Sequence, residues 1–150
     1  MATRTRPAAE AMARVLVLER AFDAPPSAVF AAWTADVQLL RWWDTMQACT
    51  IDARAGGAFR FGLRGSDSSE RRFSGSFLEV VEGERIVFTL AEEARDGRLG
   101  HETLVTVTLI EQEGKTFLTL HQAVFESVAA RDASEAEWSI RLDLLVAHLR

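Results

Sequence analysis

Hydrophobic and polar residues alternate from Val15 to Phe22, which is the two-residue period of a β-strand with one buried face. Pro25 and Pro26 then end this strand, because proline fixes its own backbone and restricts the residue before it. Proline is nevertheless acceptable in the first turn of a helix. Apolar residues next recur at helical spacing in two groups, which predicts two short helices. The groups are Val29, Phe30 and Trp33, and Leu39, Leu40, Trp42 and Trp43.

Short alternating runs separated by glycine and polar clusters follow for about eighty residues, a pattern typical of antiparallel strands and hairpins. Six strands are predicted, over residues 48–54, 58–64, 71–81, 85–91, 102–111 and 115–124. Gly56-Gly57 is read as a turn before a strand, and Glu92-Glu93 as solvated residues of a polar loop over 92–101. Together the strands read as a meander.

The last segment returns to helical spacing, with Trp138, Leu142, Leu145 and Leu149 at intervals of four, three and four. Ser134 or Asp132 begins a capping-box pattern, so this helix is expected to start near one of them. A helix of about fifteen residues would be roughly 22 Å long.

The order of elements predicts an α+β fold, in which a curved antiparallel sheet of six or seven strands wraps around one long C-terminal helix. Side chains cannot always fill the gap between such a sheet and its helix, so a pocket is expected there. One domain over residues 14–150 accounts for the pattern, preceded by a flexible leader over residues 1–13.

Composition narrows the classes of function. The 150 residues are 48% hydrophobic and carry a formal charge of -5, with the basic residues scattered among acidic ones, so nucleic acid is not expected as a partner. No apolar run approaches the length of a membrane span, and a cytoplasmic location is expected. The single cysteine, Cys49, cannot form an internal disulfide and is expected in the core.

Seven motifs, in order along residues 14–150, resemble the bacterial relatives of the heat-shock-protein-90 ATPase activator, a branch of the START-like (SRPBCC, Bet v 1-like) superfamily. They are Arg20-Ala21-Phe22-Asp23-Ala24-Pro25, Val29-Phe30 with Ala32-Trp33-Thr34, Leu40-Arg41-Trp42-Trp43, Gly56-Gly57-Ala58-Phe59-Arg60-Phe61, Glu84-Arg85-Ile86-Val87-Phe88-Thr89, Val105-Thr106-Val107-Thr108, and Trp138 with Leu142 and Leu145. The resemblance implies a helix-grip fold with a cavity between the last helix and the sheet. The chain departs from many relatives at Asp44-Thr45 and Glu137, near the expected mouth of the pocket.

The polar residues offer few candidates for chemistry. The three histidines match no short metal-ligand motif, so no metal and no cofactor are expected. By strand parity His101 can point inward at the cavity edge, whereas His121 faces water, and His148 lies in the last helical turn. Gln122 also has inward parity and could anchor a ligand. Arg20 has the same parity, and a salt bridge is its commoner explanation.

The adjacent tryptophans are expected to divide their roles, because neighbouring helix positions point about 100° apart. One of Trp42 and Trp43 should lie in the core, and the other should line or cover the cavity.

Three functions remain open. The first is a module that binds a hydrophobic or aromatic small molecule in a cavity whose polar anchors are Gln122 or His101. Its expected lining is Trp43, Phe59, Phe61, Phe73, Phe77, Phe88, His101, Val105, Val107, Gln122, Trp138 and Leu142. The second is an enzyme of the polyketide cyclase or aromatase type, in which His101, Gln122 or Arg20 polarises a carbonyl, although no catalytic residue is assigned. The third is a co-chaperone of the heat-shock ATPase, and a homodimer is left open.

Overall fold

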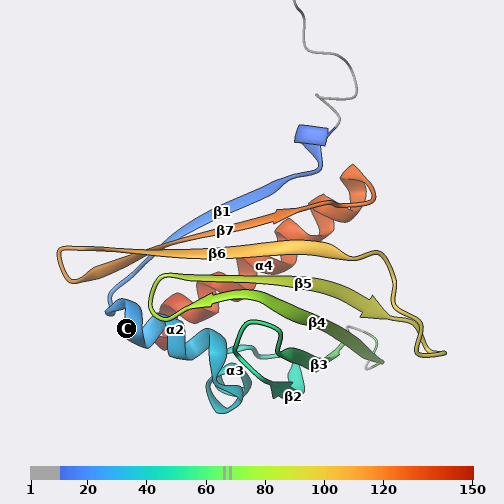
Figure 1. Cartoon of the computed structure of the whole chain (residues 1–150), viewed down its shortest axis with the longest axis horizontal. Coiled ribbons are helices and arrows are strands. Elements are labelled where there is room, and N and C mark those ends of the chain that lie inside the picture. Colours follow the sequence, from blue (N-terminus) through green and yellow to red (C-terminus); the bar gives the residue numbers. More distant parts are fainter. Residues whose placement is uncertain (1–10, 66, 68) are drawn as a thin grey trace, which may run out of the picture.

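Seven antiparallel strands form one curved sheet in the computed structural model, which describes residues 11–65, 67 and 69–150 (Figure 1). The strands are β1 (Leu16–Phe22), β2 (Met46–Ile51), β3 (Ala58–Arg64), β4 (Glu70–Val81), β5 (Arg85–Glu93), β6 (Thr103–Gln112) and β7 (Lys115–Ala123). Their order in the sheet is β1-β7-β6-β5-β4-β3-β2. Strands β2 to β7 therefore form a meander, and β1 pairs with β7 at its far edge.

Three helices accompany the sheet: α2 (Pro26–Thr34), α3 (Asp36–Trp42) and α4 (Val128–His148). Helix α4 runs along one face of the sheet, and α2 and α3 lie together near the end at which α4 finishes (Figure 1). This is the expected α+β helix-grip arrangement, with two short helices after the first strand and seven strands, one of the two numbers expected.

The first strand and its exit follow the sequence pattern closely. Leu16 and Phe22 are fully buried, whereas Val17 between them is half exposed, as a strand with one inner face requires. Pro25 has extended dihedrals (φ -72°, ψ 159°) and caps α2, with Pro26 in the first helical turn.

The core extends over the inner face of the sheet, from β1, β7 and β6 to β3, and is covered by α4, α2 and α3. In the register, Leu120 of β7 pairs with Leu18 on one side and with Val107 on the other. Leu142 and Leu145 of α4 are also fully buried. Each such side chain contributes about 1.5–3 kcal/mol by leaving water.

The last helix begins earlier than the sequence pattern indicated. Its N-cap is Ser127, whose side-chain oxygen accepts a hydrogen bond from the backbone N–H of Ala130 at 3.0 Å, so neither Ser134 nor Asp132 starts the helix. The sequence pattern predicted a later start because residues 128–133 include few large apolar side chains, so they show no helical period. With 21 residues, α4 is about 31 Å long rather than 22 Å.

Two other expectations were wrong in detail. Strand β2 spans residues 46–51 rather than 48–54, since the chain turns away after Ile51 toward the Gly56-Gly57 turn. Glu92 and Glu93 do not lie in a solvated loop but at the end of β5, where each pairs with an arginine. Arg71 on the neighbouring strand β4 and Arg60 on β3, one strand further, supply the positive charges that pair with these two glutamates.

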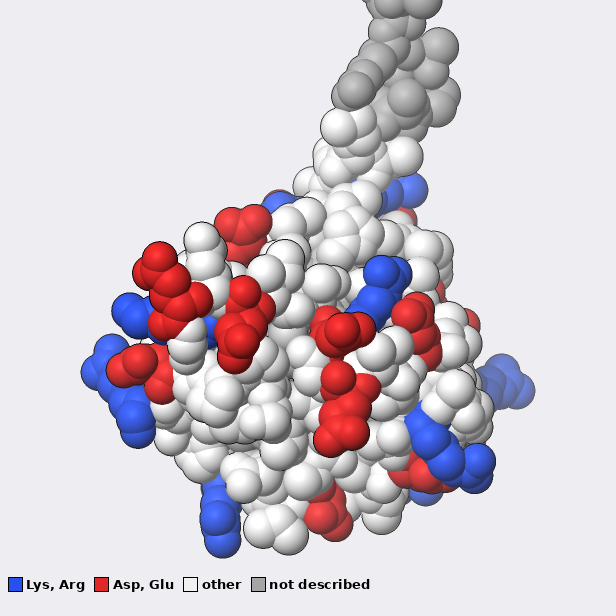
Figure 2. Space-filling model, turned by 60° about the vertical axis from the view of Figure 1, so that its left-hand side comes forward, with Lys and Arg blue, Asp and Glu red and all other residues white. Residues whose placement is uncertain are grey.

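Surface charge agrees with the composition. Acidic and basic side chains are interspersed over the face drawn in Figure 2, without a continuous basic stripe. Within residues 11–65, 67 and 69–150, none of the helices combines the length and apolar character needed to cross a bilayer. Most of the leader expected over residues 1–13 lies outside the described residues.

Candidate functional site

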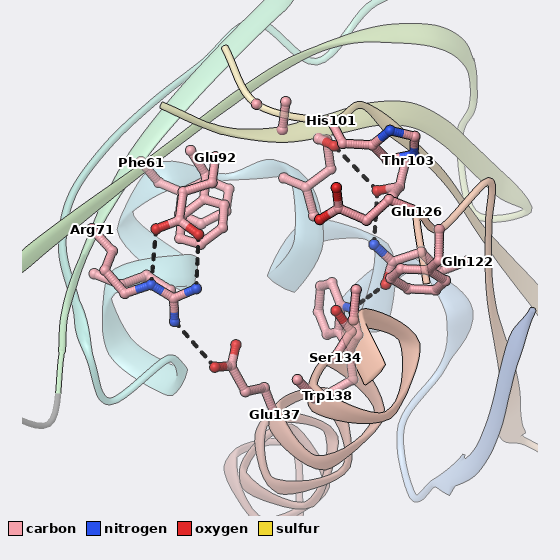
Figure 3. Close-up of a pocket in the computed structure, with 18 of the residues that line it drawn as sticks. Phe61, Arg71, Glu92, His101, Thr103, Gln122, Glu126, Ser134, Glu137 and Trp138 are labelled. Atoms are coloured by element: carbon pink, nitrogen blue, oxygen red, sulfur yellow. Dashed lines mark hydrogen bonds and ion pairs between the residues drawn. The ribbon is translucent and has the colours of Figure 1, made fainter. Parts of the chain in front are cut away.

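A cavity of about 390 Å³ lies between the N-terminal half of α4 and the sheet (Figure 3). Apolar side chains of β3, β4 and β5 form one wall, and the small residues of α4 form the other. The main lining residues are Trp43, Phe61, Leu63, Phe73, Leu90, Phe125, Ala130, Ala133 and Trp138. The volume is within the range of pockets that hold small organic molecules.

A buried chain of hydrogen bonds joins the helix to the sheet at one side of this cavity. Trp138 Nε1 donates to Gln122 Oε1 at 2.9 Å, and Gln122 Nε2 donates to Thr103 Oγ1 at 2.9 Å. Thr103 Oγ1 donates in turn to the carbonyl oxygen of Leu90 at 3.1 Å. Gln122 is only 2% exposed, so these bonds satisfy an amide that would otherwise be costly to bury.

An ion-pair chain crosses the opposite side of the cavity. Arg71 of β4 binds both carboxylate oxygens of Glu92 at 3.0 Å and reaches Glu137 of α4 at 3.1 Å (Figure 3). The hydrogen bonds that Arg71 donates to Glu92 are the main reason that the pKa of Arg71 is raised. The guanidinium carbon also lies 5.1 Å from the centre of the Phe73 ring. This chain, called the Arg71 bridge below, links the sheet to the helix.

A second, more polar hollow of about 680 Å³ borders the Arg71 bridge. It shares Trp43, Leu63, Arg71, Glu137 and Arg141 with the main cavity. Arg141 is held there by an ion pair of 3.4 Å with Asp44. The two hollows are therefore neighbours, with the Arg71 bridge part of the wall of each.

A small apolar void of about 40 Å³ lies deeper, beside the tryptophans. Trp43 and Trp138 line both this void and the main cavity, and their ring centres are 5.4 Å apart. Cys49 of β2 borders the void, where it is half-buried and packs against the core. Burial raises the pKa of its thiol to about 11.

The twelve residues expected to line a cavity separate into three groups. Trp43, Phe61, Phe73, His101, Gln122 and Trp138 line the main cavity. Phe59, Phe77 and Phe88 instead border the small void, where their rings pack on one another with centres 5.3–6.0 Å apart. Val105, Val107 and Leu142 are fully buried core residues and line neither space. Contact with a ligand stays a prediction for all of them.

The paired tryptophans do divide their roles in space. Trp42 is 3% exposed, and its Nε1 donates to the carbonyl oxygen of Ala32 at 2.8 Å within the core. Trp43 lines the cavity.

The other polar candidates are less central. His101 borders the cavity but is exposed, and its Nε2 is bonded to the carbonyl oxygen of Val124. Arg20 forms the salt bridge expected for it, to Asp143 at 2.9 Å, together with a hydrogen bond to Ser139, and it is not part of the cavity wall. His121 is exposed, and His148 contacts Gln38.

Several site residues were missed from sequence although strand parity pointed to them. Arg71 has the parity of Phe73 and Phe77, and Thr103 that of Val105 and Val107. A charged or hydroxyl residue at the end of a row of inward-facing strand positions is predicted to face solvent, unless a cavity is known to lie there. Glu137 was noted only as a departure from the family pattern.

The polar side chains around the cavity mostly pair with one another. Among the described residues, no serine or cysteine side chain is hydrogen-bonded to a histidine, and no three His, Cys, Asp or Glu residues cluster as metal ligands would. The side chains of Gln122, Thr103 and Trp138 lie close together, but their hydrogen bonds are made to one another.

A curved antiparallel sheet that grips a C-terminal helix around an aromatic cavity defines the helix-grip class of START-like proteins. Residues 23–150 match the family model described as Activator of Hsp90 ATPase homolog 1-like protein, and the chain belongs to this family. No curated protein matches the chain significantly.

Solved structures of bacterial proteins share the fold. The AHSA1 protein from Silicibacter pomeroyi is 25% identical with a TM-score of 0.81, and the match covers 90% of this chain and 96% of that one. A protein from Chromobacterium violaceum is 25% identical with a TM-score of 0.79, covering 91% and 96%. One from Rhodobacter sphaeroides is 26% identical with a TM-score of 0.77, covering 91% and 92%.

Proposed function

We propose that the protein binds a hydrophobic or aromatic small molecule in the cavity between α4 and the sheet. The observation that carries this proposal is a pocket of about 390 Å³, open to solvent, whose walls are mainly apolar and aromatic side chains with a few polar groups among them. Small-molecule sites usually have this size and this kind of lining.

The lining supports an aromatic or apolar ligand. Phe61 and Phe73 are stacked with ring centres 5.2 Å apart and planes 13° from parallel, and Trp43 packs against Phe61 at 5.6 Å. These rigid rings line the space, so an apolar or aromatic ligand can pack against them at little cost in side-chain entropy. The Gln122 chain holds Trp138 in a fixed orientation on the opposite wall.

Two alanines on α4 provide a matched test. Ala133 is exposed at the cavity and Ala136 is exposed elsewhere on the same helix. Ala133→Trp should block the cavity, whereas Ala136→Trp should leave it open. Native mass spectrometry and thermal-shift screens against lipids, flavonoids and polyketides should detect binding by the wild type and by Ala136→Trp only. A ligand at a hundred times its Kd adds about 2.7 kcal/mol, which raises the Tm of a domain of this size by about 5–11 °C.

Two outcomes would contradict the proposal. One is that no compound raises the Tm of the wild type and no small molecule is retained in native spectra. The other is that Ala133→Trp binds the same compounds with unchanged affinity, because the ligand would then occupy another site.

The family match favours one further candidate, a co-chaperone that stimulates the heat-shock-protein-90 ATPase. Such a role would use the outer surface and need no cavity. An ATPase assay with the cognate bacterial chaperone tests it: stimulation that survives Ala133→Trp supports a surface role, and absence of stimulation removes this candidate.

A further inference from the structure

Two of the four indole N–H groups have no hydrogen-bond partner in the described part of the chain. Trp42 and Trp138 donate to Ala32 and Gln122, whereas Nε1 of Trp33 and of Trp43 is buried without an acceptor. Trp43 is 8% exposed. Buried donors nearly always find an acceptor, so such an N–H indicates a water or ligand atom that completes it.

No acceptor among the described residues is bonded to Trp43 Nε1, and the hydroxyl of Thr45, which borders the polar hollow with Trp43, is buried without a partner as well. The ring lies among Trp42, Phe61 and Trp138, with centres 5.4–5.6 Å away, and it lines the main cavity as well as the small void. The void is lined by apolar side chains, apart from the Cys49 thiol and the indole N–H groups. A water there can accept hydrogen bonds from both unpartnered indoles, since Trp33 and Trp43 both line the void. Trp43 also lines the main cavity, so a ligand oxygen that reaches it can take the place of such a water and accept the same hydrogen bond.

The other end of the cavity has the opposite character. Arg71 and Arg141 contribute two positive charges, and their ion-pair partners Glu92, Glu137 and Asp44 contribute three negative ones, so this paired group has a formal charge of -1. Arg71 is already engaged by Glu92 and Glu137, and Arg141 by Asp44. A free carboxylate would therefore meet paired guanidinium groups and an excess of like charge.

We propose that the cavity selects a neutral aromatic molecule with a carbonyl-type oxygen, which accepts a hydrogen bond from Trp43 Nε1. This inference rests on the proposed binding function and adds the chemistry of the ligand. The aromatic body packs against Phe61 and Phe73, and the oxygen lies toward the tryptophans. A charged carboxylate of the same shape is disfavoured in either orientation, because it loses its hydration among the tryptophans or meets the excess negative charge of the paired group at the Arg71 bridge.

The test uses three probes of similar shape: 2-acetylnaphthalene, 2-isopropylnaphthalene and 2-naphthoate. Calorimetry should show that the wild type prefers the acetyl over the isopropyl compound by about five- to tenfold, the contribution of one hydrogen bond. Trp43→Phe keeps an aromatic ring but removes the N–H, so the preference should vanish. Trp42→Phe, whose N–H serves the core, should retain it. Naphthoate should bind at least tenfold more weakly than the acetyl compound.

A second measurement needs no variant, in case Trp43→Phe folds poorly. In ¹⁵N-labelled wild-type protein, one indole N–H resonance should move downfield with the acetyl compound and not with the isopropyl compound. Equal affinity for these two, or a preference that survives Trp43→Phe, would overturn the hydrogen bond. Tight binding of naphthoate would overturn the neutral ligand. If no probe bound at any concentration, the proposed binding function itself would fail, and this inference with it.

Discussion

The hydrogen bond between Trp138 and Gln122 should be the most sensitive polar contact in the interior, because both side chains are almost completely buried. Gln122→Leu keeps a side chain of comparable size but removes the acceptor, and Trp138 Nε1 is then a buried donor without a partner. Such a group costs about 1–3 kcal/mol. Leucine recovers part of this loss by burying apolar surface, so we expect a net loss of about 1–2 kcal/mol, or about 2–8 °C in Tm.

The reverse change isolates the same bond. Trp138→Phe leaves Gln122 Oε1 without its donor and also leaves unfilled space beside Trp43, so a loss of about 2–3 kcal/mol is expected. In the double variant neither partner remains, and the penalty for an unpaired group is not incurred twice. The double variant should therefore be more stable than the sum of the single changes predicts, by about 1–2 kcal/mol.

Urea unfolding of the four proteins completes the cycle, and unchanged m values would show that the native and unfolded states keep their compactness. Gln112→Leu, at an exposed position of β6, is the control and should change stability by less than about 0.5 kcal/mol. Additivity of the two single changes within about 0.4 kcal/mol would refute the reasoning, because it would mean that the two groups do not interact.

Three further predictions concern the backbone, the thiol and the helix start. A Cβ at Gly75 would lie 1.8 Å from a carbonyl oxygen of β5, so Gly75→Ala should lower the Tm by several degrees, whereas Gly62→Ala should be tolerated because its nearest neighbour is a flexible carboxylate at 3.0 Å. Burial raises the pKa of Cys49 from 9.0 to about 11, so the native thiol keeps a proton that the unfolded chain loses. Its contribution to stability is therefore present below pH 9 and lost between pH 9 and 11, and alkylation by iodoacetamide should still accelerate above pH 10 in the native protein but level off in urea. Ser127→Ala should cost about 1 kcal/mol in urea unfolding by removing the cap of α4, and an equal loss for Ser134→Ala would contradict the observed start of the helix.

The sequence predicted the fold well because each element depends on a repeating pattern. The alternation in β1 and β6 and the four-three-four spacing in α4 are repeated several times, and a single exception does not change the period. Boundaries depended on single residues and were less accurate. Ser127 caps α4, yet the next six residues show no apolar stripe, because those that face inward, Ala130 and Ala133, line a cavity instead of a packed core.

The candidate site was harder to predict for the same reason. Residues beside a cavity need not be apolar, so Arg71, Glu92 and Glu137 did not stand out, and Glu92 was assigned to a loop. Gln122 was recognised because an amide in an apolar row requires a partner, but its partners, Trp138 and Thr103, lie 16 and 19 residues away and could not be identified by spacing. Some aromatic residues that were predicted to line a cavity do not border the main one. Phe77 and Phe88 are apolar and face inward, but they pack on each other.

The size of the cavity follows from a gradient along α4. Toward its C-terminus the helix presents Leu142 and Leu145, which are fully buried, so that end of the gap is closed. Toward its N-terminus it presents Ala130, Ala133 and Ser134, whose side chains are too short to fill the space. A straight helix on a curved sheet is thus packed at one end and separated at the other. Substitutions in the N-terminal half should therefore alter which ligand fits while the packed half keeps the domain folded.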